Sequence, residues 1–152
     1  MKKATIARIT LRPIGVIRSP LAGPDDAPKQ GCEAAVRGEL VLAREHRAAM
    51  LGLEPGMRVV LVYWLHRAER DRHQVHPRGD PSRPLRGVFA TRSPHRPNPI
   101  ALGTVTILAV RGCTIEVEGL DAVDGTPLLD VKCEMRAPGR GRSPLAEARR
   151  RR

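Results

Sequence analysis

A mainly β fold, arranged as a barrel or a sandwich, is predicted by three features of this 152-residue sequence. Short runs of valine, isoleucine and leucine alternate with glycine and proline turns. At most one or two short segments have a helical pattern, and they do not alternate with strands as in β-α-β folds. The sequence contains no Gly-x-Gly-x-x-Gly motif, so a Rossmann-type nucleotide site is disfavoured.

The first half of the chain is expected to contain three strands and one short helix. Residues 14–18 are apolar and β-branched and lead into a Ser-Pro turn, which indicates a strand. Residues 34–42 alternate apolar and charged side chains, as a half-buried strand does. A helix is expected over residues 44–51. Residues 59–65, VVLVYWL, are continuously apolar, which predicts a strand buried on both faces.

The second half begins with a long polar segment, residues 66–86, and loops of this length are usually functional or mobile. Residues 102–110 and 113–117 both alternate and are separated by an Arg-Gly turn, which predicts a β-hairpin. An Asp-Gly turn then precedes a last strand at residues 128–133.

The chain is strongly basic, with 27 Lys plus Arg against 16 Asp plus Glu, a net charge of +11 and a pI near 11.1. This balance favours anionic partners, nucleic acid first, although a GC-rich genome also enriches arginine. Residues 137–152 are mostly arginine and small or polar residues with a single acid. We therefore expect a folded domain at 1–136 and a disordered basic tail at 137–152, which either attracts phosphate or has no role.

The three cysteines are widely spaced and include no Cys-x-x-Cys pair, which predicts reduced thiols and a cytoplasmic protein. Arg8 and Arg12 interrupt the N-terminal apolar run, so we expect neither a signal peptide nor a membrane span. His73, His76 and Cys133 do not have a recognisable metal-ligand spacing, and no metal site is expected.

The segment GVFATRSPHRPNPIALG, residues 87–103, has three prolines among its polar residues. Each proline fixes its own φ and restricts the preceding residue, so the loop is stiff before any ligand binds. Stiffness of this kind reduces the entropy lost on binding, and an ordinary connection needs no arginine or histidine. Ser93 and His95 lack an acid to complete a hydrolytic triad, so the loop is predicted to bind rather than to hydrolyse.

This segment resembles the signature of the TsaA-like (TrmO) family of S-adenosylmethionine-dependent methyltransferases. PIGVIRSP at 13–20 and GLDAVDGTPLLDVK at 119–132 agree with the family in order and spacing. The resemblance implies a small antiparallel β-barrel with one or two short helices, a homodimer, and a methyl donor bound near the subunit interface. It also implies methylation of N6 of threonylcarbamoyladenosine beside the anticodon of tRNA.

The resemblance implies that several separated stretches contact the methyl donor. Arg92 is suited to the donor's carboxylate or to a substrate phosphate, and Asp124 to its amino group or ribose. The matching positions are Lys29, Gln30, His66, Arg67, Arg92, Leu102, Asp124, Gly125, Thr126 and Pro127.

Methyl transfer depends mainly on alignment, because the methyl group is already activated. A group must still accept the N6 proton, and His95, Asn98 and Asp124 are the candidates. The sequence departs from the family where Gly31 replaces a usual proline and Ala101 a usual glycine, and it resembles a short form without the C-terminal domain. A small-molecule methyltransferase and a non-catalytic module that binds the methyl donor or RNA therefore stay open as alternatives.

Overall fold

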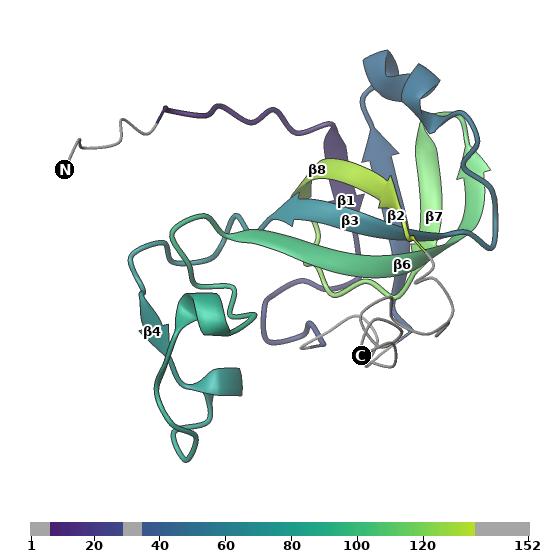
Figure 1. Ribbon diagram of the computed structural model, residues 1–152. Helices are drawn as coiled ribbons and strands as arrows, with labels where there is room; N and C mark the ends of the chain where they lie inside the picture. Colours follow the sequence, from purple (N-terminus) through teal and green to yellow (C-terminus); the bar gives the residue numbers. More distant parts are fainter. Residues whose placement is uncertain (1–6, 29–34, 136–152) are drawn as a thin grey trace, which may run out of the picture.

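The computed structural model of the chain describes residues 7–28 and 35–135. Its six main strands are antiparallel and close into a barrel in the order β1-β2-β7-β6-β3-β8 (Figure 1). The bounds are β1 Gly15–Arg18, β2 Arg37–Leu42, β3 Arg58–Trp64, β6 Ile100–Arg111, β7 Thr114–Glu118 and β8 Thr126–Cys133. The prediction of a mainly β fold is confirmed, and the architecture is a barrel rather than a sandwich.

Alternate side chains of each barrel strand fill the interior, as closure of a small barrel requires. Ile17, Leu40, Leu61, Ile115 and Leu128 are fully buried there. The expectation that residues 59–65 are buried on both faces is wrong, because only every second residue of β3 points inward and the residues between are half-buried. A barrel strand has one inner face, and an apolar run can therefore leave half of its side chains on the outside.

The predicted hairpin is confirmed as β6 and β7, which pair up to Arg111 and Thr114 around a turn with Gly112 at φ 61°. The predicted helix is a 3₁₀ helix, η2 (Arg44–Met50), which has no side-chain cap and places Met50 in the core. Short helices often take this tighter form. Among the described residues, no helix has both the length and the apolar character needed to cross a membrane.

Residues 66–99, called the arm from here on, leave the barrel after β3 and return at β6 (Figure 1). The arm contains a two-stranded ribbon of β4 (Gln74–Val75) and β5 (Arg86–Gly87) and two 3₁₀ turns, η3 (Pro77–Gly79) and η4 (Val88–Ala90).

Backbone bonds unite the long polar segment with the proline-rich loop inside the arm. The N–H of Val88 donates to the carbonyl of His73 at 2.9 Å, and the N–H of Arg96 donates to that of Glu69 at 3.1 Å. Two segments that are separate in the sequence therefore form one projection from the barrel.

Candidate functional site

The arm and the barrel border one open cleft of about 2010 Å³. The barrel contributes the first half of β6 and the segment between β7 and β8, and the arm contributes η4 and the proline-rich loop. Known small-molecule sites have volumes of roughly 300–1,000 Å³. The cleft therefore has room for a nucleotide-sized ligand together with part of a larger one.

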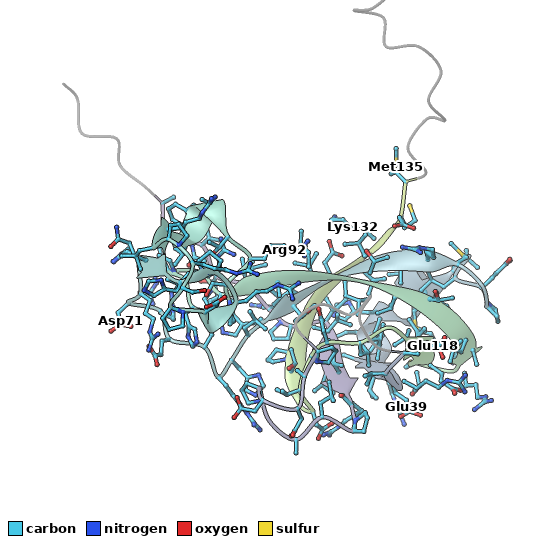
Figure 2. All side chains as sticks on the ribbon, turned by 90° about the horizontal axis from the view of Figure 1, so that it is seen from below. Glu39, Asp71, Arg92, Glu118, Lys132 and Met135 are labelled. Atoms are coloured by element: carbon cyan, nitrogen blue, oxygen red, sulfur yellow. The ribbon has the colours of Figure 1, made fainter. Side chains whose placement is uncertain are left out.

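Arg92 lies where the arm meets the barrel (Figure 2). Its Nη2 donates to the carbonyl oxygen of Leu102 at 2.8 Å, which ties the proline-rich loop to β6. This bond needs one of the five N–H donors of a guanidinium, and the side chain is exposed in the cleft. Leu102 is 51% exposed beside it, so a cationic group and an apolar surface stand next to each other.

Tyr63 and Asp121 form a hydrogen-bonded pair on the barrel side of the cleft, where the Tyr63 hydroxyl donates to Oδ1 of Asp121. Burial and, next, the negative charge of Asp121 raise the pKa of Tyr63 far above its ordinary value, so the phenol stays protonated. The charge of Arg92 acts on the same phenol in the opposite direction, which shows that the three groups interact electrostatically.

Gly103 makes room for this pair on the neighbouring strand. A Cβ at this position would lie 3.2 Å from Oδ1 of Asp121 and 3.3 Å from the hydroxyl of Tyr63. Distances this short require the neighbours to shift, and a larger side chain would displace the pair from the cleft wall. A glycine on β6 therefore helps to set the position of the Asp121 carboxylate.

Six residues of the sequence-predicted site line the cleft, namely His66, Arg67, Arg92, His95, Leu102 and Thr126. Arg67 also donates from Nη1 to the carbonyl of Ala22 at 2.8 Å, and this bond links the arm to the loop after β1. The Thr126 hydroxyl is buried and donates to the carbonyl of Val123 at 2.7 Å. The cleft thus joins the proline-rich loop to the segment that precedes β8.

His95 is held by a backbone group, because the N–H of Glu69 donates to its Nδ1 at 3.1 Å. A neutral imidazole that accepts at Nδ1 carries its proton on Nε2. In this arrangement the free ring nitrogen is a donor, and His95 would have to give up the bond to Glu69 before it could accept a proton.

Asp124, Gly125, Pro127 and Asn98 are not among the described residues that line the cleft. Oδ1 of Asp124 accepts from the N–H of Ser19 at 3.1 Å, and Oδ2 lies 3.5 Å from Nη1 of Arg18. Gly125 has a φ of 77° and its N–H donates to the carbonyl of Ile17 at 2.9 Å.

These contacts anchor the turn before β8 to the end of β1. The predicted residues Lys29 and Gln30 lie outside the described residues.

Sequence reasoning missed Tyr63, Asp121 and Gly103. The one available signal was a second aspartate, three positions before Asp124 in GLDAVDGTP. Within residues 7–28 and 35–135, no three His, Cys, Asp or Glu side chains are grouped so that they could hold a metal ion. Cys113 and Cys133 are free thiols.

Comparison with known proteins places the chain among its relatives. The family model described as the tRNA-methyltransferase O N-terminal domain matches residues 16–137. A protein of Methanothermobacter thermautotrophicus named "Probable S-adenosyl-L-methionine-binding protein" is 45% identical over 124 residues, which cover 82% of this chain and 88% of that protein. The "S-adenosyl-L-methionine-binding protein" of Archaeoglobus fulgidus is 41% identical over 122 residues, 80% of this chain and 86% of that one.

The fold is also similar to that of a solved enzyme. The crystal structure of TrmO from Pseudomonas aeruginosa superposes with a TM-score of 0.71 at 31% sequence identity, covering 92% of this chain and 63% of that one. The chain therefore spans less than two thirds of the TrmO polypeptide. Both the sequence match and the barrel show that the chain belongs to the family of the tRNA-methyltransferase O N-terminal domain.

Proposed function

We propose that the chain is an S-adenosylmethionine-dependent methyltransferase that modifies tRNA at N6 of threonylcarbamoyladenosine beside the anticodon. One observation carries the proposal: a single cleft holds Arg92, the Tyr63–Asp121 pair and the exposed Leu102, in a chain of the tRNA-methyltransferase O N-terminal family. Two relatives are named as S-adenosyl-L-methionine-binding proteins, and the match with this chain covers more than 85% of the length of each.

The residues of the cleft suit the chemistry of this methyl donor. The Arg92 guanidinium matches its carboxylate, and Leu102 offers an apolar surface to adenine. When bound, the donor supplies a methyl group activated by a positively charged sulfur. The chain itself has to hold the two reactants in line and exclude competing water.

Asp121 is the acceptor that the geometry favours for the N6 proton. Its carboxylate lines the cleft, and Tyr63 fixes its orientation through a hydroxyl that stays protonated. The three candidates from the sequence, His95, Asn98 and Asp124, are less well placed: His95 accepts a backbone N–H, and the other two do not line the cleft. A carboxylate within reach of the attacking nitrogen is the simplest base for this step.

A second copy of the chain is proposed to cover the rim of the cleft. Phe89 is 81% exposed, and Ile100 and Leu102, which line the same cleft, are 36% and 51% exposed. Apolar groups gathered in this way commonly mark an interface. Sedimentation equilibrium should give a dimer for the wild-type protein and a shift towards monomer for Phe89→Asp, and a wild-type monomer at micromolar concentration would refute the dimer.

The experiment for the activity follows a labelled methyl group. The protein is incubated with methyl-labelled S-adenosylmethionine and either bulk tRNA or a small-molecule extract, and digested tRNA nucleosides are identified by mass spectrometry. Label in N6-methylated threonylcarbamoyladenosine supports the proposal, and Asp121→Asn should reduce the rate at least tenfold while Arg111→Ala does not. Label confined to small molecules would overturn the proposal in favour of a small-molecule methyltransferase. Binding of the methyl donor without transfer would overturn it in favour of a non-catalytic binding module.

A further inference from the structure

We infer that the arm binds the phosphodiester backbone of the RNA substrate, an inference that relies on the proposed function for the identity of that RNA. The arm carries eight arginines and three acids, Glu69, Asp71 and Asp80. The rest of the described chain carries nine lysines and arginines against eleven acids. Within the described residues, the excess of positive charge therefore belongs to the arm, and this is the electrostatic footprint of a nucleic-acid binder.

The charge is distributed unevenly in space as well as in sequence. Figure 2 shows Asp71 in the arm at one end of the molecule and the acidic residues Glu39 and Glu118 at the other, with Arg92 between them. Phosphate groups are attracted to the first end, whereas acids such as Glu118, which pairs with Arg37, offset the arginines at the second. The field of the described chain would therefore turn an approaching RNA towards the arm and the cleft beside it.

The arginines of the arm have two kinds of surroundings. Arg70 lies over the Trp64 ring at 5.4 Å from its centroid and donates from Nε to the carbonyl of Pro97 at 2.9 Å. Arg96 donates to the carbonyl of Val88 at 3.3 Å. These two side chains stabilise the arm itself, and their charges add to its positive potential. Arg96 also lines the cleft.

Arg78 and Arg86 are both exposed, and both line the cleft. Arg83 lines it too, although Asp80 pairs with its Nε at 3.3 Å. Arg78 has a φ of 59°, a backbone conformation that favours glycine over any residue with a Cβ. An arginine at such a position carries a conformational cost, which points to a role for its side chain.

A strand of RNA fits this surface better than a lipid headgroup layer does. The arginines face a concave cleft that also contains Arg92 and Asp121, where the reacting base has to enter. A flat membrane surface cannot follow a concavity, whereas a phosphodiester chain can lie along its rim while one base points inward. The size of the cleft, about 2010 Å³, agrees with an RNA segment beside a methyl donor.

The test compares two double variants that remove the same charge. Arg78→Gly with Arg86→Ala removes two cations from the arm, and glycine suits the φ of residue 78, so the fold is retained. Arg44→Ala with Arg47→Ala removes two exposed cations from η2, on the barrel. Affinity for fluorescent tRNA is measured by anisotropy over a range of salt concentrations, and affinity for S-adenosylmethionine by calorimetry.

The arm variant should bind tRNA at least tenfold more weakly and lose about 1.5 from the slope of log affinity against log salt, because each phosphate contact contributes roughly 0.7–0.9. Its affinity for the methyl donor should be unchanged, and the η2 variant should match the wild type in both. Equal tRNA affinities and slopes for the arm variant and the wild type would overturn the inference. So would an equal loss in both double variants, or tighter binding to anionic phosphatidylserine vesicles than to tRNA.

The inference and the proposed function fail in different ways. An arm variant that binds and methylates tRNA as the wild type does would overturn the inference and leave the proposed function intact. A protein that binds tRNA through the arm but does not bind S-adenosylmethionine would overturn the proposed function alone.

Discussion

Tyr63 carries a hydroxyl group into a core that is otherwise almost wholly apolar, and only 3% of its surface is exposed. A buried hydroxyl needs a hydrogen-bond partner, and Asp121 provides it from the segment between β7 and β8. The pair therefore connects the barrel core to the cleft. A change in either residue is expected to alter both the stability of the fold and the position of the carboxylate.

Tyr63→Phe should make the stability less sensitive to alkaline pH. The pKa of Tyr63 is raised in the folded chain, so the phenol stays protonated while the unfolded chain loses its proton above about pH 10. The raised pKa has no effect on stability well below pH 10 and reduces it as the pH rises further. Thermal unfolding from pH 7 to 11 should give a steeper fall in Tm for the wild type than for the variant.

Tyr63 is the only tyrosine in the chain, which makes the comparison clean. At pH 7 the variant should be less stable by about 1–2 kcal/mol, because Asp121 loses its donor. Parallel Tm profiles for the two proteins would contradict the raised pKa of this phenol.

The residues that line the cleft could be predicted from the sequence only where they belong to a local motif. Arg92 and Leu102 were expected from their motif, and both line the cleft. Tyr63 and Asp121 are separated by 58 positions, and no alternation or turn signal relates two residues across a barrel. Their contact depends on how the closed barrel places the segment between β7 and β8 against β3, and no local pattern contains that arrangement.

At the scale of elements, the proline-rich loop is the segment whose stiffness is expected to matter most. The carbonyl of Pro97 accepts the bond from Arg70, and Pro99 is fully buried, so the loop is fixed at one end by packing. From Arg92 to Pro99, the backbone has little freedom to rearrange. A binding loop that is ordered in advance avoids part of the entropy cost of binding.

Pro94→Ala with Pro97→Ala should weaken binding of S-adenosylmethionine by several-fold and lower stability by roughly 1–2 kcal/mol, because the unfolded chain gains freedom. The carbonyl that Arg70 uses is kept in this variant. Calorimetry and chemical denaturation measure the two effects. Pro55→Ala, in an exposed turn before β3, is the control and should affect stability alone. Unchanged affinity in the loop variant would show that its stiffness contributes nothing to binding.

Element types followed closely from the sequence, whereas their pairing did not. Alternation in β6 and β7 predicted the hairpin because its partners are neighbours in the chain. Residues 66–86 were expected to form a long functional or mobile loop without strands, yet Gln74 pairs with Gly87 and Val75 with Arg86. Strands of two residues are too short to produce a recognisable period, and only the folded arm brings them together.

At the scale of the whole molecule, the barrel closes through contacts that no local pattern contains. Gly15 pairs with Leu42 on one side and with Leu128 on the other, so β1 joins the beginning of the chain to its last strand. Local alternation is the same in a barrel and in a sandwich, and the expectation of a barrel came from the family resemblance. Closure matters for the site, because it holds β3, β6 and the segment between β7 and β8 around one cleft.

The central claim is that the cleft between the arm and the barrel holds the methyl donor through Arg92. The most direct measurement is calorimetric titration of S-adenosylmethionine into the wild type, Arg92→Ala and Arg111→Ala; Arg111 is an exposed arginine at the far end of β6. Removing a charged partner is expected to cost about 1.5–3 kcal/mol, so Arg92→Ala should bind at least tenfold more weakly while Arg111→Ala binds as the wild type does. An Arg92→Ala affinity within twofold of the wild type would contradict the account.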